Sequence, residues 1–219
     1  MKVKLLFTYT LSSNLEVPME TGWGLPEDLL AIAEDLQHKN RGKNFEFIDE
    51  LGVTWSKKEL IKLQKKWEAE PTDITVYFDG TFQRDSLLAG LGVVIYYKKG
   101  PEQWRVRANQ VVEQLTNNNE AEFAALKFGM QLLEDLGVKY QRCRIRGDSL
   151  VVLNQLSGEW PCYEDELHRW IERIEKKRKE LSVQFQFEPI HRNKNREADQ
   201  LAKQAVEGKN IYSHSRIDT

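Results

Sequence analysis

The chain has 219 residues, of which 40% are hydrophobic and 30% are charged, with a formal net charge of -2. This balance predicts a soluble globular protein with room for one large domain or two smaller ones. The longest apolar runs, such as 91–97, are too short to cross a bilayer, and we expect no secretion signal. Two cysteines, Cys143 and Cys162, exclude a disulfide framework and indicate the reducing cytoplasm.

The net charge gives no overall attraction to nucleic acid, so phosphate binding would depend on local basic patches. Three short segments are rich in basic residues, and each alone also suits a solvated face. They are Arg142 to Arg146, Lys176 to Lys179, and Arg192 to Arg196.

Residues 1–70 predict a small α+β domain. Strand-like segments at 2–10 and 15–21 precede a helix at 26–38, and two short strands at 45–49 and 53–55 flank a tight turn. Ser56 and Glu59 form a predicted capping box that begins a helix to about Ala69. Pro71 follows this helix and marks the domain boundary, so that 71–219 form the second domain.

From Asp73 onward the pattern predicts an α/β domain. Three strands come first, followed by a helix, a strand, two helices, a strand and a last helix. The expected strands are 74–82, 90–98, 103–113, 141–148 and 183–189. The expected helices are 119–136, 149–156, 164–181 and 195–206. This order predicts a mixed five-stranded sheet with flanking helices.

Two predicted strands end in an aspartate beside small residues. Asp79 precedes Gly80, and Asp148 lies between Gly147 and Ser149. Functional sites of open α/β sheets gather at such carboxyl ends. On parallel neighbouring strands the two carboxylates would repel each other unless a proton or a divalent cation lay between them. Each aspartate alone also suits a structural role, in a turn or as a helix cap.

Two further acids have equally simple structural readings. Glu122 follows Asn119 by three residues, so the pair suits a capping box at the start of a helix. Asp199 lies on the last predicted helix, where it suits a surface charge. Separately, none of the four acids indicates a site.

Together the motifs resemble ribonuclease H type 1 domains, often called reverse-transcriptase-like, in order and spacing. The motifs are Asp79-Gly80, Ala89-Gly90-Leu91-Gly92, Asn118-Asn119 ahead of Ala121-Glu122, Gly147-Asp148-Ser149, and Asn195 ahead of Ala198-Asp199. The resemblance covers the chain from Asp73 onward and implies a ribonuclease H-like sheet. The family pattern selects Glu122 rather than Glu120, with Asn117 where threonine is usual.

The resemblance implies a metal-dependent endonuclease that hydrolyses the RNA strand of RNA/DNA hybrids with two ions of Mg²⁺ or Mn²⁺ per active site. Asp79 would bridge both ions, Glu122 and Asp148 would complete one site, and Asp199 the other. Carboxylates suit these hard cations, which prefer oxygen ligands. One ion activates water and the other stabilises the leaving oxygen.

The resemblance also implies a set of substrate-binding residues. They are Gly80, Asn118, Asn119, Ser149, Arg192 and Asn195. Asn118 and Asn119 match residues that contact 2′-hydroxyls in the minor groove. Arg192 and Asn195 match residues that hold a loop or a phosphate. His191 lies near the loop where relatives carry a histidine that helps product release, and the alternative is a strand-end histidine without a role.

Two alternatives stay open. The first is a nucleic-acid-binding module of this fold with little or no catalytic activity. The second is a phosphotransferase of the wider superfamily, which the missing glycine-rich phosphate loop disfavours. We expect residues 1–70, of unknown role, to contact substrate or a protein partner. The lysines of the helix at 56–69 suit contact with a phosphate backbone, and the alternative is a solvated helix. These lysines are Lys57, Lys58, Lys62, Lys65 and Lys66.

Overall fold

The computed structural model describes residues 1–217, apart from the side chain of Glu68. The chain divides into two compact units, Met1–Ala69 (unit 1) and Glu70–Thr219 (unit 2). Each unit has its own sheet and its own cluster of buried hydrophobic side chains. Within the described residues, no helix is long and apolar enough to span a membrane.

Unit 1 is the small α+β domain expected from the sequence. Its elements are β1 (Val3–Thr10), β2 (Glu16–Glu20), α1 (Pro26–His38), β3 (Gly42–Asp49), β4 (Thr54–Ser56) and α2 (Lys57–Ala69). The strands form an antiparallel sheet in the order β2-β1-β3-β4. The predicted capping box is confirmed, because the Ser56 N–H donates to Glu59 Oε2 over 2.9 Å and the Glu59 N–H donates back to Ser56 Oγ over 3.3 Å.

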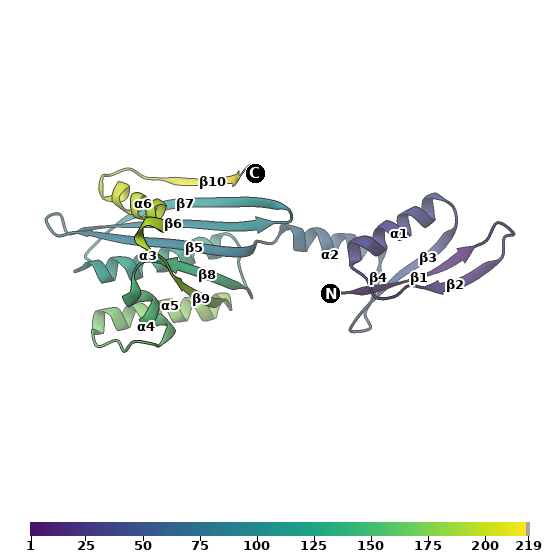
Figure 1. Ribbon diagram of the computed structural model, residues 1–219, viewed down its shortest axis with the longest axis horizontal. Helices are drawn as coiled ribbons and strands as arrows, with labels where there is room; N and C mark the ends of the chain where they lie inside the picture. Colours follow the sequence, from purple (N-terminus) through teal and green to yellow (C-terminus); the bar gives the residue numbers. More distant parts are fainter. Residues whose placement is uncertain (218–219) are drawn as a thin grey trace. The chain divides into compact units, whose positions relative to one another are not determined.

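Unit 2 is a mixed sheet with helices on both faces (Figure 1). Its elements are β5 (Thr72–Gln83), β6 (Leu88–Lys99), β7 (Glu102–Glu113), α3 (Asn118–Asp135), β8 (Arg142–Gly147), α4 (Leu150–Ser157), α5 (Asp165–Leu181), β9 (Gln184–Pro189), the 3-10 turn η1 (Arg192–Lys194), α6 (Arg196–Val206) and β10 (Tyr212–Ile217).

The sheet has the strand order β10-β7-β6-β5-β8-β9. Strands β5, β6 and β7 pair antiparallel, whereas β8 is parallel to both β5 and β9. The five expected strands are present, and β10 adds a sixth that pairs antiparallel with β7. The expectation of five strands was therefore one short, because 212–217 are mostly polar and carry no hydrophobic alternation.

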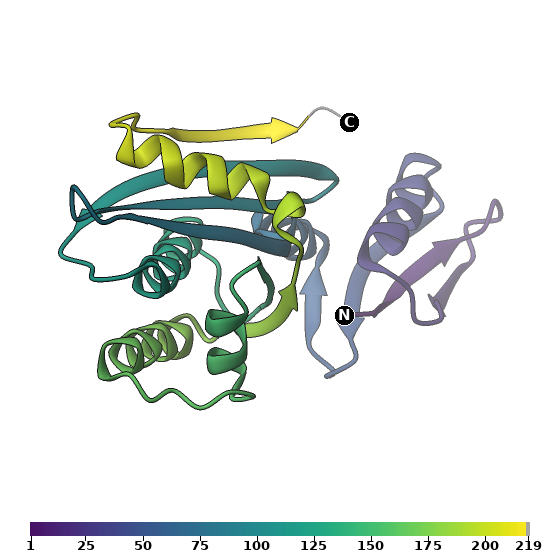
Figure 2. The same cartoon turned by 60° about the vertical axis from the view of Figure 1, so that its left-hand side comes forward.

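The two faces of the sheet are covered by different helices. Val76 of β5 and Val93 of β6 face Gly129 of α3, whereas Gly90 and Gly92 of β6 lie against the backbone of α6. Figure 2 shows α6 crossing one face while α3 lies on the other. A Cβ at Gly90 or Gly92 would collide with carbonyl oxygens of α6, so these glycines allow the helix to lie close to the sheet.

Candidate active site

Asp79 lies within β5, and Asp148 directly follows the end of the neighbouring strand β8. Strands β5 and β8 are parallel, and the last pair in their register joins Tyr77 to Arg146. Asp79 follows Tyr77 by two residues on β5 and therefore points to the same face of the sheet as Tyr77. Asp148 lies close enough to Asp79 for its charge to act on the Asp79 carboxyl group. Asp79 is buried, with 7% of its surface exposed, and Asp148 is half-buried.

Gly80 allows the first turn of α3 to bring Glu122 to this end of the sheet. A Cβ at Gly80 would overlap the backbone of Ala121. The absence of a side chain therefore permits a contact that any other residue would prevent. Glu122 is buried, and its Oε2 has no hydrogen-bond partner among the described residues. Gly80, expected to bind substrate, thus has a packing role that the sequence did not reveal.

The neighbouring Glu120 has a structural role. Asn117 is the N-cap of α3, and its Oδ1 accepts a hydrogen bond from the Glu120 N–H over 2.9 Å. The Glu120 carboxylate accepts from the backbone N–H and the hydroxyl of Thr116, and from Trp170 Nε1. The capping reading that paired Asn119 with Glu122 is therefore wrong, because Asn117 and Glu120 already cap this helix.

The carboxyl group of Glu120 titrates accordingly. Burial raises the pKa of Glu120, but hydrogen bonds from Thr116 and Trp170 outweigh burial and hold the pKa below its usual value. Glu120 is thus a satisfied, ionised capping residue, whereas Glu122 faces the other acids.

Asp199 reaches the site on the first turns of α6, between two basic side chains. Its Oδ2 lies 2.7 Å from Lys203 Nζ and its Oδ1 lies 3.6 Å from Arg192. Lys203 was not singled out in the sequence, although its i,i+4 spacing from Asp199 on a predicted helix is a recognised signal for an ion pair. Arg192 is exposed and therefore able to contact both Asp199 and a ligand.

Asn195 holds two parts of the site together. Its Nδ2 donates to the backbone carbonyl of Phe78 over 2.9 Å and to Asp148 Oδ1 over 2.7 Å. Only 1% of Asn195 is exposed. The expectation that Asn195 contacts substrate is therefore corrected: it is buried and links Asp148 to Phe78 of β5.

The buried acids raise one another's pKa. Burial raises the pKa of Asp79 to about 7, with contributions from Asp148 and Asp199 that Arg192 and Lys203 only partly offset. Burial, together with Asp79 and Asp148, raises the pKa of Glu122 well above its usual value. Clustered carboxylates in a site of low polarity resist ionisation unless a cation neutralises them.

The four acids do not form a preassembled metal cluster. In the part of the chain that the structure describes, no three acidic, histidine or cysteine side chains converge into a ready-made metal cluster. Asp148 is instead hydrogen-bonded to Asn195, and Asp199 is paired with Lys203. The unpartnered Oε2 of Glu122 and the raised pKa of Asp79 fit an oxygen-rich site for a hard divalent cation.

The remaining candidate residues surround these acids at the surface. Asn118 is exposed, and its Oδ1 accepts a hydrogen bond from the Phe82 N–H over 3.2 Å. Asn119 and Ser149 are half-buried at the starts of α3 and α4. His191 is exposed just before η1. Asn118 is thus held by its carbonyl oxygen at the end of β5.

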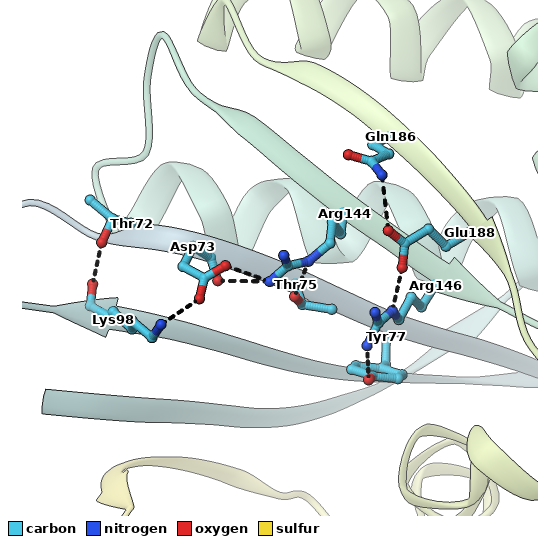
Figure 3. Close-up of polar contacts among 9 residues, drawn as sticks. All are labelled: Thr72, Asp73, Thr75, Tyr77, Lys98, Arg144, Arg146, Gln186 and Glu188. Carbon is cyan, nitrogen blue, oxygen red and sulfur yellow. Dashed lines mark hydrogen bonds and ion pairs between the residues drawn. The ribbon is translucent and has the colours of Figure 1, made fainter.

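Two arginines of β8, Arg144 and Arg146, are occupied by neighbouring side chains (Figure 3). Arg144 contacts Asp73 and Thr75, and Arg146 contacts Glu188 and the Tyr77 hydroxyl. Both arginines are about one-third exposed, with 36% and 33% of their side chains accessible. Their charges are therefore largely matched within the sheet face, which makes them poor candidates for gripping phosphates.

Comparison with known proteins agrees with this fold and motif order. The family model described as reverse transcriptase-like matches residues 77–205. The chain therefore belongs to the reverse transcriptase-like family, and unit 2 has the fold of a type 1 ribonuclease H. The resemblance expected from the sequence is confirmed.

Individual relatives cover different shares of the chain. The uncharacterized protein YpeP of Bacillus subtilis (strain 168) is 43% identical over 196 residues, which are 90% of this chain and 86% of that protein. LC11-RNase H1 in complex with RNA/DNA hybrid is 27% identical over 62% of this chain and 98% of its own, with a TM-score of 0.52. RNase H1 from Halobacterium salinarum is 24% identical over 62% of this chain and 98% of its own, with a TM-score of 0.51.

Proposed function

We propose that this chain is a metal-dependent endoribonuclease that hydrolyses the RNA strand of RNA/DNA hybrids. The observation that carries the proposal is the buried pair Asp79 and Glu122, whose pKa values are both raised and whose free oxygen, Glu122 Oε2, has no partner among the described residues. A divalent cation relieves such repulsion. The structure of LC11-RNase H1 with an RNA/DNA hybrid supports the choice of substrate.

Two ions of Mg²⁺ or Mn²⁺ would be held by four carboxylates. These carboxylates belong to Asp79, Glu122, Asp148 and Asp199. When bound, such ions would activate water and stabilise the charge on the leaving oxygen.

The chain's own residues prepare this site. Asn195 links Asp148 to Phe78 of β5, and Lys203 holds Asp199 on α6. Gly80 lets α3 approach closely enough to bring Glu122 beside Asp79. Each contact fixes a carboxylate before metal arrives, which lowers the cost of assembling the site.

Substrate would lie across the exposed rim of these acids. Asn118 and Asn119 would contact ribose 2′-hydroxyls, since an amide both donates and accepts hydrogen bonds. Ser149 and the exposed Arg192 would contact phosphates. His191, exposed beside η1, would assist product release.

The first experiment compares cleavage of a labelled RNA/DNA hybrid with all-RNA and all-DNA duplexes, in Mg²⁺ and then in Mn²⁺. We expect cleavage of the hybrid alone. Asp79→Asn and Glu122→Gln should each lower the rate by at least ~100-fold, because the loss of even an outer-shell partner of a metal costs 10–100-fold. Glu120→Gln is the matched control and should keep most of the activity.

Two outcomes would contradict this proposal. Hybrid binding without turnover in either metal would favour the alternative of a binding module with little catalytic activity. Loss of cleavage in Glu120→Gln, with retention in Glu122→Gln, would move the ligand to Glu120.

We also propose a cytoplasmic location, supported by two free thiols. Burial raises the pKa of Cys143 to about 12, so this thiol stays protonated and unreactive. Recovery of the protein outside the cytoplasm on cell fractionation would overturn the location.

A further inference from the structure

One face of α2 in unit 1 is strongly basic. Four lysines, at spacings of three and four residues, fall within an arc of about 100° on the helix. These residues, called here the lysine face, are Lys58, Lys62, Lys65 and Lys66, and all four are exposed. The other side of the helix packs into unit 1 through Leu60, of which 1% is exposed, and through Ile61.

No ion-pair partner of the lysine face is found among the described side chains. Among the side chains that the structure describes, no carboxylate forms an ion pair with any of the four lysines. Glu59, the acid nearest in sequence, is occupied by Ser56 in the capping box. Like charges one turn apart on a helix repel one another, so an external anion would relieve a standing repulsion.

Other lysines of unit 1, in contrast, form ion pairs with acidic side chains. Lys57 Nζ lies 3.4 Å from Glu34 Oε1 and 3.3 Å from Gln37 Oε1. Lys39 is paired with Asp35, and Lys43 with Glu16. The sequence grouped Lys57 with the basic face of this helix, but the structure directs it toward α1, so it does not belong to the lysine face.

The geometry of the lysine face suits the backbone of a nucleic acid. From Lys58 to Lys66 the helix rises about 12 Å, at 1.5 Å per residue. A nucleic acid strand carries one phosphate for each ~3.4 Å of its axis, so four ammonium groups over this length match its charge density. Lysine contacts phosphate as a flexible point charge and carries no base preference. A helix lying on a membrane would need a wide free apolar face, and Leu60 and Ile61 are already packed within unit 1.

We propose that the lysine face binds the phosphate backbone of nucleic acid duplexes without regard to sequence, separately from the four carboxylates of unit 2. This inference extends the proposed function, because it rests on nucleic acid as the substrate class. It does not require turnover.

The test measures equilibrium binding of the full chain to fluorescent duplexes in EDTA, where metal-dependent cleavage cannot occur. The test variant is Lys62→Gln/Lys66→Gln, because glutamine removes the charge and keeps a helix propensity close to that of lysine. The control is Lys39→Gln/Lys43→Gln, which removes the same charge from lysines that are paired with acids. The probes are an RNA/DNA hybrid, a DNA duplex of the same sequence, and vesicles that contain an anionic lipid.

We expect the test variant to bind both duplexes about tenfold more weakly at 0.1 M salt, and the slope of log K against log salt to shrink by about 1.8. The control should match the wild type. Equal affinity and slope for wild type and test variant would overturn the proposal, as would a loss confined to the vesicles. A failure of the proposed cleavage function would appear instead in the hybrid assay with Asp79→Asn, so the two failures are distinguishable.

Discussion

Asp79 is the residue whose surroundings oppose its charge most clearly. Its pKa is raised from 3.8 to about 7, first by burial and then by Asp148 and Asp199. Between about pH 4 and 7, Asp79 therefore keeps its proton in the metal-free folded protein, whereas the unfolded chain has already lost it. Unfolding releases that proton, so the free energy of unfolding falls as the pH rises across this window, by about 1.4 kcal/mol for each unit of difference in pKa.

We expect Mg²⁺ to reverse this loss of stability. A ligand that binds only the folded state raises its stability, and at low pH the proton on Asp79 competes with the ion. Thermal melts in EDTA should show a lower Tm at pH 8 than at pH 6, and Mg²⁺ should raise the Tm more at pH 8. Asp79→Asn should be more stable than wild type at pH 8 without metal, whereas Asp85→Asn, in the exposed turn after β5, should change nothing. If the Tm of Asp79→Asn depended on pH and Mg²⁺ in the same way as the Tm of the wild type, Asp79 would not be the source of either dependence.

Asn195 gives a second prediction at the scale of a residue. Asn195→Ala removes the hydrogen bonds to Phe78 and Asp148 and leaves Asp148 free to turn away. We expect Mg²⁺ affinity to fall by about 10–100-fold and the free energy of unfolding by about 1–3 kcal/mol. Titration calorimetry and chemical denaturation would measure these two effects. Asn193→Ala, at an exposed position of η1, is the matched control. Unchanged metal affinity in Asn195→Ala would show that Asn195 only stabilises the fold.

The sequence was enough to select the four candidate acids, but it did not predict the contacts that hold them. The order of motifs was enough to name Asp79, Glu122, Asp148 and Asp199. The role of Glu120 was not predictable, because Asn117 and Asn119 are equally good helix caps and only the structure shows which one accepts the hydrogen bond. The burial of Asn195 depends on packing between β5 and α6, which local sequence does not encode.

At the scale of an element, the approach of α6 to β6 determines where Asp199 lies. Gly92 faces the carbonyl oxygen of Ala198, the residue that precedes Asp199. Gly92→Ala would push the helix away or strain the strand, at a cost of about 1–3 kcal/mol. We expect this variant to lose metal affinity as well as stability, since Asp199 moves with the helix.

The control for Gly92→Ala is Gly22→Ala, because a Cβ at Gly22 meets no atom within 4 Å. Differential scanning calorimetry with and without Mg²⁺ would measure both quantities. If Gly92→Ala lowered the Tm but kept wild-type metal affinity, the close packing would be needed for stability alone.

The elements that the sequence failed to predict are those held by polar contacts. β10 pairs with β7, and its His214 lies 2.7 Å from the Tyr97 hydroxyl, an arrangement that no hydrophobic pattern announces. The partners of Arg144 and Arg146 were not predictable either, because Asp73 and Glu188 are distant from these arginines in sequence.

At the scale of the whole molecule, the two units have separate hydrophobic cores. The core of unit 1 is small and includes Phe47 and Leu60, whereas unit 2 has a much larger cluster that includes Phe78 and Phe123. All four carboxylates belong to unit 2. A small core supplies little net stability, so unit 1 should be the first to unfold.

Phe47→Ala tests this separation. Phe47 is fully buried, and its loss should cost about 3–5 kcal/mol, enough to unfold a unit of this size. We expect circular dichroism melts of Phe47→Ala to lose an early transition. The later transition should keep its Mg²⁺-dependent rise, because the proposed metal ligands are in unit 2. Leu51→Ala, at a position that is 90% exposed, should leave both transitions in place. A single transition that Phe47→Ala lowers, together with loss of the Mg²⁺ effect, would mean that the two cores fold as one and that the carboxylate site depends on both.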